Sequence, residues 1–212
     1  MDMDGTLFDA KKKTKANRIS LKMLHNYLNE TGILQRMEKE EIIRINKDVM
    51  NDHVTTTIRS ISNRYGIGIK EIGSLAYDIL PEDVGINRDE RLVRQLSAIS
   101  KSYKLAVFSN GYEIWVKRVI RSLGLGSIIR KSMIVSPPNM GKYVKPEPGS
   151  FAMMLKKTRL RRSDILFLDD KMQNVSMARK IGIRSMLVDN SGSNKINSIY
   201  SILDRIALGK VK

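Results

Sequence analysis

The chain has 212 residues, enough for one large hydrophobic core, with or without a small accessory domain, and too few for two full-sized domains. Hydrophobic residues make up 42% of the chain and charged residues 28%, a balance that is typical of soluble globular proteins and excludes disordered and fibrous classes. Because there is no cysteine, disulfides, thiolate metal sites and a cysteine nucleophile are excluded.

The formal net charge of +16 favours anionic ligands such as nucleotides, sugar phosphates or nucleic acid. The basic residues are scattered and aromatic residues make up only 6%, so a small phosphorylated substrate is favoured over nucleic acid. Apolar runs such as Ile165–Leu168 are far shorter than the roughly 20 residues that span a bilayer. With acidic first residues in place of a signal peptide, we expect a cytoplasmic protein without a membrane segment.

The first half of the chain has a helical pattern. Met1–Asp9 is acidic, contains glycine and is expected to be the end of a strand that passes into a loop. Apolar residues then recur at helical spacing, from Ile19 to Leu28 and from Ile42 to Ile61. We therefore predict a helical block over 14–88, without a strand, which ends at the link Pro81–Gly85.

From Glu90 onward, helical segments alternate with short apolar runs. The runs are Leu105–Phe108, Met133–Val135, Ile165–Leu168 and Met186–Val188, and a last helix is expected around Ile196–Ala207. This alternation predicts an α/β fold with a doubly wound parallel sheet covered by helices on both faces. The active site of such a fold lies at the carboxyl ends of the strands.

Four polar clusters stand in such positions, two of them directly after an apolar run. Asp2 and Asp4, two residues apart on an extended segment, are expected to point the same way. The other clusters are Ser109-Asn110-Gly111, Lys145 in a proline-containing loop, and Asp169-Asp170. Simpler interpretations are a frayed Asp2, a surface Lys145, and helix capping by the serine, asparagine and aspartate side chains.

These four clusters, in this order, resemble the motifs of the haloacid dehalogenase superfamily. The resemblance covers Met1–Asp9 and roughly Asp89–Asp189. It implies a Rossmann-like core formed by 1–13 and 89–212, with a small helical cap over 14–88 inserted between the first two motifs. The activity it implies is that of a phosphatase acting on small phosphate monoesters.

The resemblance also implies a role for each matching residue. Asp2 is the expected nucleophile, which forms an aspartyl-phosphate, and Asp4 the expected general acid and base. Lys145 is expected to neutralise the charge of the aspartyl and phosphoryl groups. The expected phosphate-binding residues are Ser109, Asn110, Gly111 and Lys145.

A magnesium ion is the cofactor that the resemblance implies. Its expected ligands are Asp2, the backbone carbonyl of Asp4 and Asp170, with Asp169 in a supporting position or as an alternate ligand. Physical chemistry agrees, since neighbouring carboxylates cannot all stay ionised without a cation, and Mg²⁺ prefers oxygen ligands.

Asp4 favours phosphate esters over haloacids, because an alkoxide leaving group needs a proton and a halide does not. Tyr77–Ile86, together with the second and fourth motifs, is similar to the branch that includes pyrimidine 5'-nucleotidases, which suggests a nucleoside monophosphate. The alternatives are a sugar phosphomutase and a basic relative that binds nucleic acid or protein with little catalysis.

The chain departs from the family before its first motif. Only Met1 precedes Asp2, where relatives have an apolar run of about four or five residues that forms the central strand. We therefore expect low stability or activity of this form, and a higher melting temperature when an apolar extension is added. Seven further residues are expected to be ordinary surface or core side chains: His25, His53, Arg59, Arg64, Tyr65, Tyr112 and Trp115.

Overall fold

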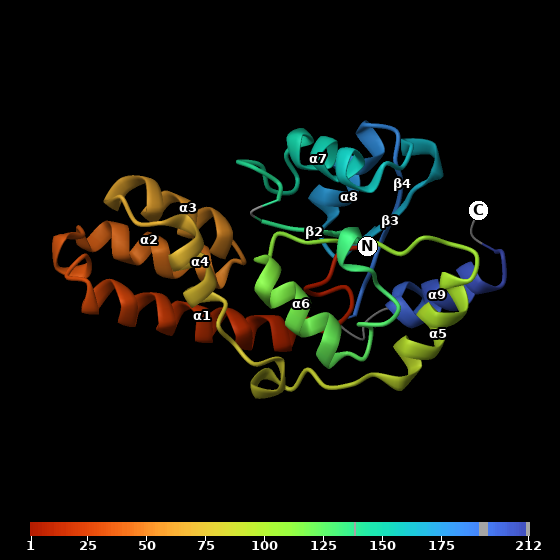
Figure 1. The fold of residues 1–212 in the computed structure, drawn as a ribbon, viewed down its shortest axis with the longest axis horizontal. Coiled ribbons are helices and arrows are strands. Elements are labelled where there is room, and N and C mark those ends of the chain that lie inside the picture. The colour runs from red at the N-terminus through yellow and green to blue at the C-terminus, as the bar shows by residue number, and fades with distance from the viewer. Residues whose placement is uncertain (138, 191–194, 211–212) are drawn as a thin grey trace.

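The computed structural model describes residues 1–137, 139–190 and 195–210 (Figure 1). The predicted α/β fold with a helical block is confirmed. The helices are α1 (Ala10–Glu30), α2 (Lys39–Met50), α3 (Val54–Tyr65), α4 (Ile69–Ala76), α5 (Glu90–Ser100), α6 (Glu113–Ser122), α7 (Pro148–Thr158), α8 (Met172–Lys180) and α9 (Ile199–Ala207). The strands are β1 (Val107–Phe108), β2 (Ile134–Val135), β3 (Leu166–Asp169) and β4 (Arg184–Leu187), and 3₁₀ turns lie at Leu34–Arg36, Pro81–Val84, Lys131–Met133, Arg162–Asp164 and Lys195–Asn197.

The strands form two parallel pairs, β1 with β2 and β3 with β4. Between the pairs lies the beginning of the chain, which bonds to both of them. The Met1 amino group donates to Ala106 O at 2.9 Å and Met1 O accepts from Phe108 N–H at 2.9 Å, while Asp2 N–H donates to Leu168 O at 2.7 Å. Met1–Asp2 thus occupies the central position between β1 and β3.

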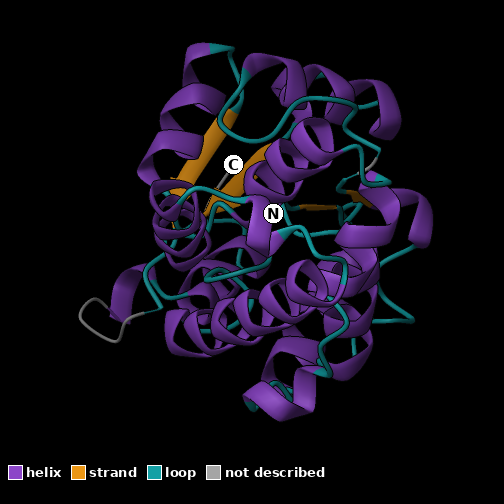
Figure 2. Cartoon of the chain, turned by 90° about the vertical axis from the view of Figure 1, so that its left-hand side faces the viewer, coloured by secondary structure: helices purple, strands orange, loops and turns teal. Residues whose placement is uncertain are grey.

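Alternate strand residues contribute to two different apolar clusters. Val107 and Leu168 pack into a cluster with α5, α6 and α9, whereas Phe108 and Phe167 pack into a second one with α7 and α8. Because successive side chains of a strand point to opposite faces, both faces of the strands are covered by helices (Figure 2).

Helices α1 to α4 lie at one end of the molecule, and the strands with α5 to α9 at the other (Figure 1). Helix α1 packs against α2 and α4, and α3 against α2 and α4. Their buried residues recur at helical spacing, as in Leu24 and Leu28 of α1 and in Ile58 and Ile61 of α3. Among the described residues, no helix has the length and apolarity needed to cross a membrane.

Helix α1 begins at Ala10, four residues before the predicted start of the helical block. Asp9 is its N-cap, and the Asp9 carboxylate accepts the backbone N–H of Lys12 at 3.0 Å. The lysines Lys11–Lys15 therefore lie on the first turns of a helix, and α1 reaches from the first motif into the helical block.

Candidate active site

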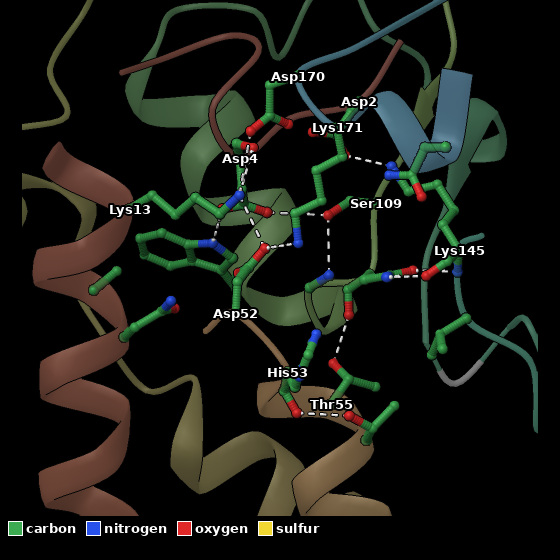
Figure 3. A pocket seen from close by; sticks show the side chains of 18 of the residues that line it. Asp2, Asp4, Lys13, Asp52, His53, Thr55, Ser109, Lys145, Asp170 and Lys171 are labelled. Carbon is green, nitrogen blue, oxygen red and sulfur yellow. Dashed lines mark hydrogen bonds and ion pairs between the residues drawn. The ribbon is translucent and has the colours of Figure 1, made fainter. Parts of the chain in front are cut away.

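A cavity opens where the first segment, β1 and β3 end, facing the helical block (Figure 3). The carboxyl ends of these parallel segments bring together residues that are far apart in the sequence, as the fold class predicts. The cavity is lined by seven of the eight predicted site residues, namely Asp2, Asp4, Ser109, Asn110, Gly111, Lys145 and Asp170. Side chains of α1 and of the turn between α2 and α3 form the opposite wall.

Lys145 joins two of the predicted carboxylates. Its ammonium donates to Asp2 Oδ1 at 2.5 Å and to Asp169 Oδ2 at 2.7 Å. Both Asp2 and Lys145 are 5% exposed, and Asp169 is fully buried. The two carboxylates raise the pKa of Lys145 against the opposing effect of burial, so this lysine stays charged. Neither a frayed Asp2 nor a surface Lys145 fits these contacts.

Asp4 is held by two donors. The Ser109 hydroxyl donates to its Oδ2 at 3.1 Å, and the indole N–H of Trp115 donates to its Oδ1 at 2.9 Å. Burial, followed by the negative charge of Asp2, raises the pKa of Asp4 to about 6. A carboxyl group with this pKa can both give and take a proton near neutral pH.

The second motif orients Lys145 through Asn110. The Asn110 side chain accepts the Lys145 backbone N–H at 2.8 Å and donates to the Lys145 carbonyl at 3.0 Å. The Gly111 N–H donates to Ser109 Oγ at 3.0 Å. Helix α6 has Tyr112 as its N-cap residue without a side-chain cap bond, so the capping interpretation of Ser109 and Asn110 is wrong.

The two aspartates of the fourth motif differ in their partners. Asp169 is saturated, because its carboxylate accepts from Lys145, from the Asn174 amide at 2.9 and 3.0 Å, and from the Lys171 backbone N–H at 2.8 Å. Asp170 Oδ1 is buried and finds no hydrogen-bond partner among the residues that the structure describes. The N-cap of α8 is Lys171, so neither aspartate is the cap residue.

These carboxylates fit a divalent cation. One oxygen each of Asp2, Asp169 and Asp170 lie within 4.8 Å of one another, and the unpartnered Asp170 oxygen is a free ligand atom. Gly5 makes the close approach possible: its φ is +88°, and a Cβ there would lie 2.3 Å from Asp170 Oδ2.

Several polar residues of the cavity lie outside the predicted site, among them Lys13, Asn17, Asp52 and Thr55. The Thr55 hydroxyl donates to the Asn110 carbonyl at 2.5 Å, and thus links α3 to the second motif. Lys13 forms an ion pair with Asp52 at 2.9 Å. Helical periodicity places such residues on a helix face but does not reveal that they face a distant loop, so no local pattern indicates that they belong to the site.

Of the seven residues expected to be ordinary surface or core side chains, two line the cavity, Trp115 and His53. Trp115 is buried as predicted and also bonds Asp4. His25 pairs with Asn46 at 2.7 Å, away from the cavity lining. Among the others, Arg64 and Tyr65 contact Glu41, Tyr112 OH donates to Ile69 O, and Arg59 donates to Gly141 O and Lys142 O.

The fold and the cavity define a doubly wound α/β protein with a carboxylate-rich site at the strand ends. The model of the family described as haloacid dehalogenase-like hydrolase matches residues 1–188, and the chain therefore belongs to this family. The resemblance inferred from the four motifs is thereby confirmed at the level of the family.

Solved structures show the same fold. A putative beta-phosphoglucomutase from Bacteroides vulgatus is 17% identical with a TM-score of 0.54, over 99% of this chain and 87% of its own. L-2-haloacid dehalogenase from Xanthobacter autotrophicus is 17% identical with a TM-score of 0.51, over 88% and 75%. The same enzyme with chloropropionic acid covalently bound is 15% identical with a TM-score of 0.52, over 100% and 82%.

Proposed function

We propose that this hydrolase is a Mg²⁺-dependent phosphatase that hydrolyses small phosphate monoesters through an aspartyl-phosphate on Asp2. The observation that carries the proposal is the pair of carboxylates on one short segment, with Asp2 bonded to Lys145 and Asp4 bonded to Ser109 and Trp115. The reaction could cleave a P–O bond or a carbon–halogen bond, and the second carboxylate, that of Asp4, favours the first of these.

Asp4 supports phosphate esters as substrates. Cleaving a P–O bond leaves an alkoxide, which needs a proton, whereas cleaving a carbon–halogen bond leaves a halide, which does not. Asp4 lies two residues from Asp2 and lines the same cavity. Its pKa of about 6 leaves a protonated fraction near neutral pH and makes the conjugate base effective in the following step.

The proposed reaction has two steps. A carboxylate oxygen of Asp2 attacks phosphorus, the bond from phosphorus to the ester oxygen breaks, and protonated Asp4 gives its proton to that oxygen. Asp4 then takes a proton from water as the water oxygen attacks phosphorus, and the bond from phosphorus to Asp2 breaks. Phosphate leaves, and Asp2 and Asp4 are regenerated.

Lys145 and Ser109 serve both steps in this proposal, and the part of Ser109 is to bind the phosphoryl group that is transferred. Lys145 offsets the charge of Asp2 and of phosphoryl oxygens, from a position fixed by Asn110. Mg²⁺, held by Asp2, the Asp4 carbonyl and Asp170, would supply further positive charge for the phosphoryl oxygens. The substrate class we propose is small monoesters, with nucleoside monophosphates as one candidate group.

Phosphate release from a panel of sugar phosphates and nucleoside monophosphates, with Mg²⁺ or with EDTA, tests the proposal. Metal-dependent release that Asp2→Asn abolishes is expected. Chloride release from 2-chloropropionate and isomerisation of a sugar phosphate, measured with the same protein, test the dehalogenase and mutase alternatives. Salt-sensitive binding of RNA or DNA without any turnover would favour the binding-protein alternative.

Asp4→Asn tests the proton-donor role separately. The first step of an activated ester such as p-nitrophenyl phosphate needs little protonation, so its kcat/KM should fall much less than that of an alkyl phosphate. Equal losses for the two substrates would contradict the assignment of Asp4 as the acid.

A further inference from the structure

Lys13 lies against the proposed metal site. Its ammonium donates to the backbone carbonyl of Asp4 at 3.2 Å and to Asp170 Oδ2 at 3.5 Å. It also lies 2.9 Å from Asp52 Oδ2. Figure 3 shows the side chain reaching from α1 into the cavity, between Asp52 and Asp170. The residue is 9% exposed, so this positive charge is largely removed from water.

Two of these three partners are proposed ligands of the cation. A divalent ion bound to the Asp4 carbonyl and Asp170 would lie about 2 Å from each ligand oxygen, and therefore within a few Å of the ammonium as it now stands. Repulsion between the two cations at such a distance is large in a partly buried site. Lys13 cannot keep all its present contacts when the ion binds.

The Asp52 carboxylate is an alternative partner for the Lys13 ammonium. This carboxylate is already the closest of the three partners, and it lies on the turn between α2 and α3 with a φ of +67°. The Lys171 ammonium approaches the same Asp52 oxygen at 2.5 Å. Asp52 therefore belongs to the helical block and pairs with two cations, Lys13 of α1 and Lys171 of the segment after β3.

We infer that Lys13 is a built-in counter-ion of the metal site, which competes with the divalent cation and turns fully to Asp52 when that cation binds. The inference rests on the proposed function, because it takes Asp4 and Asp170 as metal ligands. It adds that metal binding is linked, through the Lys13–Asp52 ion pair, to the turn of the helical block that faces the cavity.

The test is a titration with Mn²⁺, followed by electron paramagnetic resonance of the free ion, on the full chain and its Lys13→Gln variant. Removing the competitor should tighten Mn²⁺ binding at least about tenfold. Lys171→Gln is the matched control, because it removes a charge from the same Asp52 without touching a proposed ligand. It should change the affinity less than about threefold.

Each outcome is decisive. Equal Mn²⁺ affinity in the wild type and Lys13→Gln, or an equal gain in Lys171→Gln, would overturn the inference while leaving the metal site of the proposed function intact. Absence of binding by both proteins would overturn the metal site and the inference together. Binding by Lys13→Gln alone would support the inference and contradict the Mg²⁺ requirement of the wild type.

Thermal unfolding provides a second measurement, which remains informative if Lys13→Gln lowers the stability of the protein. Without metal, Lys13→Gln leaves the carboxylates uncompensated and should melt lower than the wild type, and saturating Mg²⁺ should raise its melting temperature more than that of the wild type. In a double-mutant cycle, Asp52→Asn should weaken Mn²⁺ binding several-fold in the wild type and less in Lys13→Gln. Additive effects in the cycle would contradict the link.

Discussion

Trp115 donates its indole N–H to Asp4 Oδ1 at 2.9 Å, from a position in the core of α6. This bond stabilises the ionised carboxylate and lowers the pKa of Asp4, against the larger effect of burial. Trp115→Phe keeps an aromatic ring and removes the donor. The pKa of Asp4 should rise, so the alkaline limb of the kcat/KM profile should move to higher pH, and kcat should fall about tenfold.

Tyr112→Phe is the matched control for this profile. Tyr112 precedes the same helix and donates its hydroxyl to Ile69 O at 2.9 Å instead of to Asp4. Its pH profile should match that of the wild type. A Trp115→Phe profile that also matches the wild type would show that the indole bond does not tune Asp4.

Asn110 should act on catalysis through Lys145, since it binds both the N–H and the carbonyl of that residue. Asn110→Ala removes both bonds and frees the loop, so kcat should fall by roughly 10- to 100-fold, equivalent to about 1–3 kcal/mol. Asn139→Ala, which removes an exposed amide bonded to Glu113 at 3.0 Å, is the control and should keep full activity. Equal kcat values for the two variants would refute the positioning role.

The ionised carboxylate of Asp170 is expected to lower the free energy of unfolding when no metal is bound. Burial, followed by the charge of Asp2, raises the pKa of Asp170 from 3.8 to about 7, and Lys13 offsets this only in part. Between pH 4 and 7 the unfolded chain has released this proton while the folded chain retains it, so the contribution of Asp170 to stability falls as pH rises.

Asp170→Asn removes this dependence. In EDTA at pH 7.5, urea unfolding should show the variant more stable than the wild type by about 1–3 kcal/mol, and at pH 4 the two should be similar. The advantage should shrink in Mg²⁺, which binds the wild type. A variant that is less stable than the wild type at pH 7.5 in EDTA would contradict the raised pKa.

An apolar cavity of about 380 Å³ lies between β1 and β3, beside Met1. Its walls include side chains of both strand pairs and of the helices on either face, among them Met1, Leu105, Phe108, Phe167, Leu203 and Ile206. Adding about five β-branched residues before Met1 should extend the central segment and fill this space. Each buried side chain contributes about 1.5–3 kcal/mol at best, so a rise in melting temperature of about 5–10 °C is expected.

An extension of equal length made of glycine and serine is the control for added chain length. It should leave the melting temperature unchanged, because it offers no apolar surface. Equal melting temperatures of the proteins with the apolar and the polar extension would show that no added strand fills the cavity.

The order of strands and helices, and the gathering of Asp2, Asp4, Ser109 and Lys145, could be predicted because parallel strands place their carboxyl ends at one edge. Trp115 was predicted as core from its position, yet burial does not tell which acceptor an indole N–H finds. Lys13 and Asp52 meet only because α1 and the α2–α3 turn face the cavity, a tertiary relation that no local pattern carries. Helix α1 begins at Ala10 because Asp9 caps it, a start that the apolar periodicity from Ile19 onward does not indicate.

In the proposed mechanism, Asp2 itself accepts the phosphoryl group. Its most direct test is acid quenching of the protein during turnover of the best substrate in the panel, followed by mass spectrometry of the N-terminal peptide. This mechanism predicts a phosphoryl adduct on Asp2 that is absent from Asp2→Asn and accumulates in Asp4→Asn with an activated ester, where the water-activating base is missing. Phosphate release by the wild type without an adduct on Asp2, or undiminished release by Asp2→Asn, would contradict it.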